Sequence, residues 1–282
     1  MKSIVITGAS TGIGYVLAQQ LLQRGFRVFG SVRKAADGER LQQELGDNFV
    51  PLLFDVTDEA AVQKAAEQVA EQVGDQGLFA LVNNAGIAIG GPILHLPLDE
   101  WRRQFEVNVF GLLATTKAFA PLLGARKDCP HPPGKIFNVG SVAGSIANPF
   151  MGPYCGSKHA LEGISKSLRA EMLLYGIDVV VLAPGVVKTP IWEKAKKEDM
   201  HQYDHTDYKD AIRKLEAYIQ VHSEDGYEQG EFGQLAANII TNPAPKFHYV
   251  LVKSRLRNWI IPRLLPARTF LTLVGKRLGL LA

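Results

Sequence analysis

The chain has 282 residues, of which 46% are apolar, 9% aromatic and 21% charged. This balance is that of an ordinary globular protein, and it excludes a disordered or fibrous chain. Two cysteines, Cys129 and Cys155, are too few for a disulfide framework or a cysteine-based zinc site. They agree with a reducing compartment, and we expect a cytoplasmic protein.

Positive charge is concentrated at the C-terminal end. Eight basic residues and no acidic one follow Glu231, whereas residues 1–231 hold 23 basic and 28 acidic side chains. A basic tail of this kind contacts a membrane in some proteins, and in others it covers an acidic body or borders an oligomer contact. Both interpretations are open for residues 254–282, and no nucleic-acid partner is expected.

The N-terminus carries no targeting pattern, because only a short apolar run precedes Gly8. No apolar stretch of the chain approaches the roughly 20 residues that span a bilayer. We therefore expect no integral membrane segment.

Short β-branched runs alternate with longer helical stretches. A buried strand at 4–7 is followed by a glycine-rich turn and a helix to about Arg24. The further strands are expected at 27–32, 49–54, 78–83, 135–139, 177–182 and 247–252, and the further helices at about 38–45, 58–73, 99–125 and 154–175. Nearly all-apolar strands joined by helical crossovers predict an α/β fold with a doubly wound parallel sheet.

One region breaks this rhythm. Residues 188–245 insert mainly helical sequence of mixed polarity between the last two strands. The chain has no internal repeat, low-complexity segment or Gly/Ser linker. The sequence therefore predicts a single domain over residues 1–282.

The first turn after a strand is rich in glycine. It reads Thr7-Gly8-Ala9-Ser10-Thr11-Gly12-Ile13-Gly14. Such glycines permit a sharp turn, close approach of backbone amides to a pyrophosphate, and tight helix packing, while the following helix N-terminus favours an anion. The pattern predicts a dinucleotide site and lacks the G-K-[ST] of a nucleoside triphosphatase.

Polar residues also end the next strands. Asp55-Val56 follows the strand at 49–54, where the carboxylate could accept a hydrogen bond from an adenine amino group or favour the next helix N-terminus. Asn83-Asn84-Ala85-Gly86 ends another strand, and its two amides suit either a structural turn or contact with a ribose. Both interpretations stay open for each segment.

A tyrosine and a lysine share one helical face. Tyr154 and Lys158 lie four residues apart at the start of a helix, and an ammonium beside a phenol lowers the phenol pKa. Ser141 follows the strand at 135–139, at the sheet edge where doubly wound folds bind ligands. A hydroxyl there can donate to a substrate oxygen and stabilise developing charge.

Together these segments resemble the short-chain dehydrogenase/reductase family. The matching motifs are Thr7–Gly14, Asn83–Gly86, Ser141, Tyr154-Cys-Gly-Ser-Lys158 and Pro184-Gly185, in the family's order over about residues 1–190. The resemblance implies a Rossmann-type domain with a seven-stranded parallel sheet, an NAD(P) cofactor and a homodimer or homotetramer.

The resemblance also implies roles for individual residues. Tyr154 is the general acid in reduction and the base in oxidation, Lys158 orients the ribose, Ser141 holds the reacting oxygen, and Asn108 links the lysine to solvent through water. The cofactor contacts that it implies are Gly8, Ser10, Thr11, Gly12, Ile13, Gly14, Arg33, Lys34, Asp55, Val56, Asn83, Ala85, Gly86, Tyr154, Lys158, Pro184, Gly185, Val187 and Thr189.

The second strand indicates which cofactor is preferred. It ends in Val32-Arg33-Lys34, with no acid before Asp37. An acid there holds the ribose 2′-hydroxyl of NAD, whereas an arginine accommodates the 2′-phosphate of NADP. We therefore expect NADP(H) to be preferred, with NAD(H) as the alternative. No metal is expected, since His201 and His205 have metal spacing but no evident third ligand.

The end of the chain resembles the hydroxysteroid and retinol dehydrogenase branch. With a substrate lid at about 188–226, this favours a hydrophobic, steroid- or retinoid-like alcohol or ketone. A 3-oxoacyl-thioester reductase and a non-enzymatic NADP(H)-binding regulatory protein are the alternatives. In the tail, Pro262 and Pro266 are expected to prevent one continuous helix, which leaves a short amphipathic helix at about 267–279.

Overall fold

The computed structural model describes residues 1–189, 200–222 and 225–281. Its centre is a seven-stranded sheet in which every neighbouring pair is parallel, in the order β3-β2-β1-β4-β5-β6-β7. The strands are β1 (Ser3–Ile6), β2 (Arg27–Val32), β3 (Phe49–Leu53), β4 (Ala80–Asn83), β5 (Lys135–Val139), β6 (Asp178–Pro184) and β7 (His248–Leu251). The predicted Rossmann-type α/β fold is confirmed.

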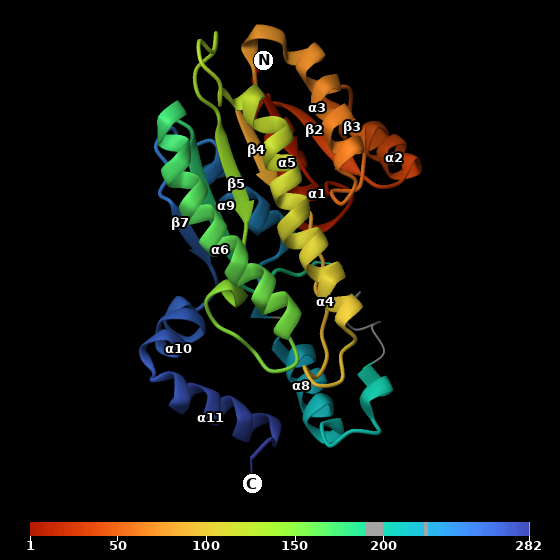
Figure 1. Ribbon diagram of the computed structural model, residues 1–282, viewed down its shortest axis with the longest axis vertical. Helices are drawn as coiled ribbons and strands as arrows, with labels where there is room; N and C mark the ends of the chain where they lie inside the picture. The colour runs from red at the N-terminus through yellow and green to blue at the C-terminus, as the bar shows by residue number, and fades with distance from the viewer. Residues whose placement is uncertain (190–199, 223–224, 282) are drawn as a thin grey trace.

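Helices cover both faces of this sheet (Figure 1). Within the described ranges they are α1 (Gly12–Gln23), α2 (Ala35–Leu45), α3 (Glu59–Val73), α4 (Leu98–Phe105), α5 (Gly111–Phe119), α6 (Gly152–Met172), α8 (Lys209–His222), α9 (Gln229–Ile240), α10 (Ile261–Leu264) and α11 (Ala267–Leu278). The strands run from the end where the N-terminus lies toward the end that carries α8, α10 and α11.

Two apolar cores lie on opposite faces of the sheet. Leu17 of α1, Leu41 of α2 and Phe232 of α9 pack on one face, while Val69 of α3 and Phe119 of α5 pack on the other. All five side chains are fully or almost fully buried. Alternate residues of each strand supply the two cores, since successive side chains of a strand point to opposite faces.

The predicted helix at about 99–125 is divided in the structure. A π-helical turn, η2 (Glu106–Phe110), separates α4 from α5, and η3 (Ala120–Leu123) follows as a 3-10 turn. Such π turns inside a helix often mark functional positions, because the extra residue changes which side chain faces inward. Asn108 lies in the middle of η2.

The C-terminal tail corrects one expectation. Pro262 does not interrupt the helical path, because α10, in which it is the second residue, continues directly from the π-helical turn η8 (Leu256–Ile260). The path is irregular just before Pro262 but is not broken there. Pro266 does end the path: its extended backbone separates α10 from α11. The amphipathic helix predicted at 267–279 is confirmed.

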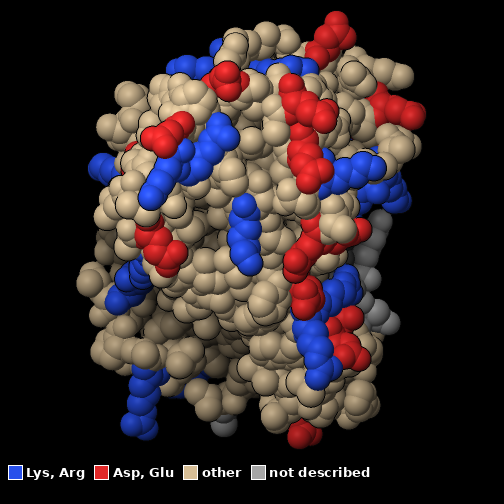
Figure 2. Space-filling model, turned by 45° about the horizontal axis from the view of Figure 1, so that its top comes forward, with Lys and Arg blue, Asp and Glu red and all other residues tan. Residues whose placement is uncertain are grey.

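No helix among residues 1–189, 200–222 and 225–281 is long and apolar enough to cross a membrane. Acidic and basic side chains are mixed over the upper part of the face in Figure 2.

Candidate active site

The glycine-rich turn lies between the carboxyl end of β1 and the start of α1. Gly8 and Gly12 have φ of 68° and 62°, a backbone region that favours glycine. A Cβ on Gly14 would overlap the Gly8 carbonyl oxygen and the Asn84 side-chain amide. Thr11 is the N-cap of α1 and makes no side-chain capping hydrogen bond. The turn therefore presents a close-packed cradle and a helix N-terminus of the kind that binds a pyrophosphate.

Asn83 and Asn84 have structural partners. The Asn83 side chain is buried and donates to Thr116 Oγ1 and to Asn138 Oδ1, while it accepts from Thr115 Oγ1. The Asn84 side chain donates to the carbonyl oxygens of Thr7 and Gly8, and so braces the glycine turn. For these two side chains the geometry favours the structural interpretation.

Charged groups gather beyond the ends of β2 and β3. Arg33 Nη1 lies 3.9 Å from Asp55 Oδ2, and the Arg33 side chain is 70% exposed. Asp55 Oδ1 accepts from Thr57 N and Oγ1, so its carboxylate shapes the turn before α3, although Asp58 is the N-cap residue of that helix. Lys34 is the N-cap residue of α2.

The structure adds a second arginine that the sequence interpretation missed. Arg40 Nη2 on α2 donates to the Ser10 carbonyl oxygen at 3.0 Å, and the same guanidinium pairs with Asp37 and Glu44. Arg40 lies six residues after Lys34 and belongs to no recognisable sequence motif. Only the packing of α2 beside the glycine turn brings it to Ser10.

Ser141 and Tyr154 meet at the carboxyl end of β5. Ser141 is the N-cap residue of η4 (Val142–Gly144), where its Oγ accepts from Ala143 N at 3.1 Å. Its side chain also lies near that of Tyr154, in the first turn of α6, and acts on the pKa of that phenol. Desolvation by the surrounding protein raises the pKa of Tyr154, and the Ser141 contact lowers it in part.

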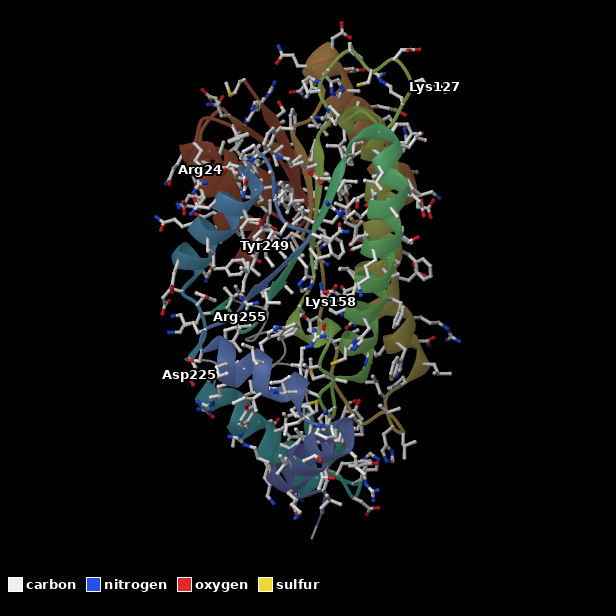
Figure 3. The ribbon with its side chains drawn as sticks, turned by 90° about the vertical axis from the view of Figure 1, so that its left-hand side faces the viewer. Arg24, Lys127, Lys158, Asp225, Tyr249 and Arg255 are labelled. Carbon is white, nitrogen blue, oxygen red and sulfur yellow. The ribbon has the colours of Figure 1, made fainter. Side chains whose placement is uncertain are left out.

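Lys158 lies between α6 and the sheet (Figure 3) and is almost fully buried. Its Nζ donates to the Val139 carbonyl oxygen at 2.8 Å and lies 5.8 Å from the centre of the Tyr154 ring. Burial lowers the pKa of Lys158 to about 8, against the opposing effect of Glu162. The expected lowering of the Tyr154 pKa is not found, because desolvation of the phenol outweighs the effects that stabilise the phenolate.

The π-helical geometry of η2 directs the Asn108 side chain toward the loop after β4. Asn108 Nδ2 donates to the Ile87 carbonyl oxygen and to Ser157 Oγ, and its Oδ1 accepts from Ile87 N. Gln104, one turn earlier, is fully buried and bridges Ile89 N and the Ile87 carbonyl oxygen. Sequence reasoning missed Gln104, which helps Asn108 to hold this loop.

The segment after β6 completes the same edge of the sheet. Pro184 is the last residue of β6, Gly185 N donates to the Leu251 carbonyl oxygen, and Val187 pairs with Tyr227 in an isolated bridge. Thr189 is buried. The part of the predicted lid at 190–199, with Trp192, Lys194, Lys196, Lys197, Glu198 and Asp199, lies outside the described residues, as do 223–224.

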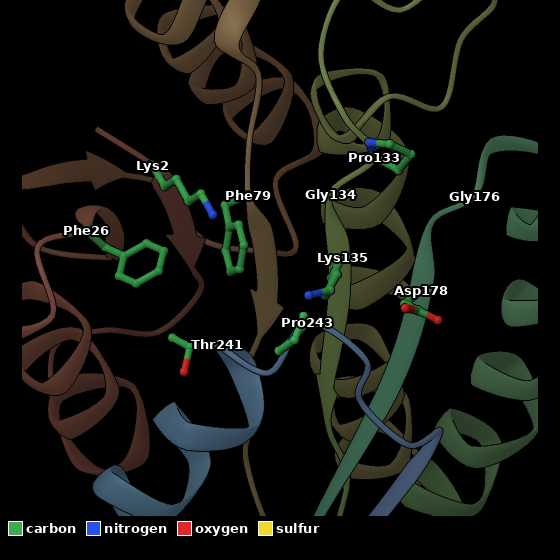
Figure 4. A pocket seen from close by; sticks show the side chains of 10 residues that line it. All are labelled: Lys2, Phe26, Phe79, Pro133, Gly134, Lys135, Gly176, Asp178, Thr241 and Pro243. Atoms are coloured by element: carbon green, nitrogen blue, oxygen red, sulfur yellow. The ribbon is translucent and has the colours of Figure 1, made fainter.

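A surface groove of about 370 Å³ lies at the opposite, amino end of the strands (Figure 4). Lys2 and Lys135 place their ammonium groups about 5 Å from the centre of the Phe79 ring there. None of the predicted site residues lines this groove. Ligands of doubly wound sheets bind outside the carboxyl ends of the strands, which is the end that carries Ser141, Tyr154 and Lys158 and not this groove.

The fold and this site define a dehydrogenase or reductase of the Rossmann type, which acts on CH–OH or C=O groups. Residues 2–200 match the model of the short chain dehydrogenase family, and the chain belongs to that family. Its fold binds NAD(P), and the family acts on small molecules.

Three known proteins illustrate the relationship. The chain is 39% identical to an NADPH-dependent 3-dehydrocapnine reductase of Ornithobacterium rhinotracheale, over 95% of this chain and 94% of that protein. It is 41% identical to human retinol dehydrogenase 5, over 67% of this chain and 57% of the relative. A crystal structure of a short-chain dehydrogenase from Streptomyces avermitilis matches with a TM-score of 0.77 at 24% identity, over 98% of this chain and 97% of that one.

Proposed function

We propose that this protein is an NADP(H)-dependent oxidoreductase that transfers hydride between the nicotinamide and a hydrophobic ketone or alcohol. The observation that carries the proposal is that the Ser141 and Tyr154 hydroxyls and the Lys158 ammonium lie together at the carboxyl end of β5, on the sheet edge that also carries the glycine turn. The bound dinucleotide supplies or accepts the hydride at C4 of its nicotinamide. The chain's own residues hold the carbonyl and move the proton.

Each residue has one task in this mechanism. Ser141, which lies near the Tyr154 phenol, would donate to the substrate oxygen. Tyr154 gives its proton to that oxygen in reduction and takes it back in oxidation. Lys158, with its Nζ 5.8 Å from the centre of the Tyr154 ring, would bind the ribose, and Asn108 of η2 would connect the lysine to solvent through water.

The glycine turn and the segments around it would hold the dinucleotide. Gly8, Gly12 and Gly14 leave space for the pyrophosphate, and the uncapped start of α1 adds backbone donors. The ends of β3, β4 and β6 supply the remaining contacts, which include Val56, Ala85, Gly86, Pro184, Gly185, Val187 and Thr189.

Preference for NADP(H) rests on charge. Arg33 and Lys34 follow β2, Arg40 reaches Ser10 from α2, and no carboxylate occupies the end of β2. These cations and the hydroxyls of Ser10 and Thr11 suit a 2′-phosphate. The relative from Ornithobacterium is NADPH-dependent by its name.

A hydrophobic substrate is supported by an apolar cluster at the same end of the sheet. Ile89, Phe150 and Tyr203 pack there with Ile212 of α8 and Leu278 of α11. We propose that the described part of the segment 188–226, which supplies Tyr203 and Ile212 to this cluster, belongs to a substrate lid, and that residues 254–282 are an appended tail of the single domain. The substrate is then a steroid- or retinoid-like alcohol or ketone, in line with the name of retinol dehydrogenase 5.

A substrate screen tests this proposal. Purified protein is offered hydrophobic ketones, retinoids, steroids and a 3-oxoacyl thioester with NADPH or NADH, and alcohols with NADP or NAD. We expect turnover of hydrophobic carbonyls with NADPH. Preference for the thioester would identify a 3-oxoacyl-thioester reductase, and NADPH binding without any turnover would identify a regulatory protein.

The tail also presents a surface suited to a lipid interface. Its exposed apolar side chains include Leu256, Ile261, Leu264 (77% exposed), Leu271 and Leu273. Six cations stand among them, and none forms an ion pair with a carboxylate in the described part of the chain: Arg255, Arg257, Arg263, Arg268, Lys276 and Arg277. We place the protein in the cytoplasm as a homodimer or homotetramer whose tail touches anionic lipid.

A further inference from the structure

Glu162 is a buried carboxylate that the mechanism above does not use. It lies one helical turn after Lys158 on α6 and is 7% exposed. Its Oε1 is 2.9 Å from His248 Nε2, on the edge strand β7 and 86 residues away in the sequence. Burying a carboxylate costs folding free energy unless the group is paired, which suggests that Glu162 has a specific role.

The Glu162 side chain packs against both ends of the loop that carries Ser141. A Cβ added to Gly144 would lie 3.0 Å from Glu162 Cγ, and one added to Gly140 would lie 3.6 Å from Glu162 Oε1. Ser141 stands between these two glycines. The carboxylate therefore supports the turn that aims the Ser141 hydroxyl at Tyr154.

The charge of Glu162 also acts on Lys158. From α6, Tyr154 and Glu162 are the titratable groups near the ammonium, and from β5 the Val139 carbonyl oxygen accepts its hydrogen bond. From β7, His248 reaches the lysine through Glu162. Glu162 opposes the desolvation that lowers the Lys158 pKa to about 8.

We propose that Glu162, anchored by His248, is a positioning residue that keeps Lys158 protonated near neutral pH and holds the Ser141 loop. The catalytic part of this inference rests on the proposed function. Without Glu162, the buried ammonium would lose its proton at lower pH. Lys158 would then be neutral when its positive charge is needed beside the phenol and the ribose.

The direct test does not depend on turnover. Protein labelled with ¹³C at lysine Cε is titrated by NMR, and Lys158 is assigned by the signal that disappears in Lys158→Arg. We expect Glu162→Gln to lower the Lys158 pKa by about one unit or more, since it removes a neighbouring opposite charge. Glu171→Gln is the matched control, because it removes an exposed carboxylate from the same helix. Its Lys158 signal should titrate as in the wild type.

The kinetic test follows the same variants. With Glu162→Gln the alkaline limb of the kcat/KM profile should move to lower pH by the shift that NMR measures, while Glu162→Asp, which keeps the charge, should restore most of the profile. An unchanged Lys158 titration in folded Glu162→Gln would overturn the proposal. If that variant does not fold, Glu162→Met fills a similar volume without charge and carries the same prediction. Absence of turnover in the wild type would reject only the proposed function, because the NMR titration of Lys158 does not depend on catalysis.

Discussion

Helix α1 and the C-terminal tail use similar residues in opposite ways. In α1, Leu17 and Leu21 are fully buried against the sheet, and Arg24 at its end donates to Asn238 and Thr241 near α9. In the tail, Leu264 and Leu271 are more than half exposed. Figure 3 labels Arg24, at the end of α1, and Arg255, at the start of the tail.

The difference lies in what each helix packs against. A helix beside the sheet packs its whole apolar stripe against strands and a neighbouring helix. Helix α11 packs Val274 and Leu278 near α8, whereas Leu271 and Leu273 on the same helix are each 53% exposed. Composition alone does not distinguish the two cases, because burial depends on the available surface. If this difference matters, changes in the body, which is the sheet with its covering helices, should alter activity and stability. Changes in the tail (254–282) should alter only what the surface binds.

The largest effect is expected at the centre of the body. Tyr154→Phe removes the proton that is transferred but keeps the ring, so we expect kcat to fall by about 10²–10⁴-fold with cofactor binding retained. Steady-state rates and NADPH fluorescence titration measure the two quantities. Activity near that of the wild type would reject the role of Tyr154.

Matched leucine truncations compare the two regions directly. Leu17→Ala creates a cavity in the core and should lower the free energy of unfolding by about 2–5 kcal/mol. Leu271→Ala removes an exposed side chain and should change it by less than about 0.5 kcal/mol. Denaturant unfolding of both variants provides the measurement. A comparable loss for Leu271→Ala would show that the tail face is covered in solution.

Lys158 gives the body a distinct dependence on pH. Its folded pKa of about 8 is below the ordinary value of 10.5, so the unfolded chain binds more protons between these values. Its contribution to the free energy of unfolding is therefore least favourable below pH 8 and rises through this window, by up to about 3 kcal/mol. Unfolding of wild type and Lys158→Met at several pH values should show a smaller rise in the variant. Parallel curves would mean that the lysine is better solvated than its burial implies.

Cofactor choice is the next effect in size. Arg33→Asp places a carboxylate where the 2′-phosphate is expected, so the ratio of kcat/KM for NADPH to that for NADH should fall at least about tenfold. Arg126→Asp, in the loop before β5, reverses a charge at the other end of the strands and is the control. An unchanged ratio in Arg33→Asp would mean that another residue reads the phosphate.

The smallest effect on the fold is expected for exposed leucines of the tail, and binding to lipid vesicles is the measurement that tests their role. Wild type should sediment with vesicles that contain phosphatidylglycerol and much less with phosphatidylcholine alone, and high salt should release it. Leu264→Ser/Leu271→Ser should lose most of this binding with activity retained.

The matched control replaces two other leucines that are more than half exposed, Leu173 and Leu174, in η5 (Leu173–Tyr175) at the amino end of β6. Sedimentation equilibrium of the same proteins detects the competing outcome. If the wild type does not bind vesicles and the tail variant instead dissociates an oligomer or loses substrate affinity, the exposed leucines form a protein contact.

Much of the body could be predicted because its signals are local. β-Branched runs, helical periodicity and glycine punctuation predicted seven parallel strands and most helices, and spacing within one turn linked Tyr154 to Lys158. The helix at 99–125 was predicted without its π turn, because hydrophobic periodicity does not reveal a single extra residue in one turn. That turn contains Asn108, whose side chain donates to the Ile87 carbonyl oxygen. Likewise, Pro262 was predicted to interrupt the helix, whereas the π turn η8 leads directly into α10 across this proline.

The amino-acid sequence by itself determined the class of fold and the glycine turn, because each depends on neighbours within a few residues, and the order of its motifs pointed to the side chains that we propose as reactive. Tertiary structure decided the rest. It placed Arg40 at Ser10, raised the Tyr154 pKa through desolvation and brought His248 to Glu162 across 86 residues. Burial and long-range contacts are properties of the packed chain, and no local pattern encodes which buried charge will meet which partner.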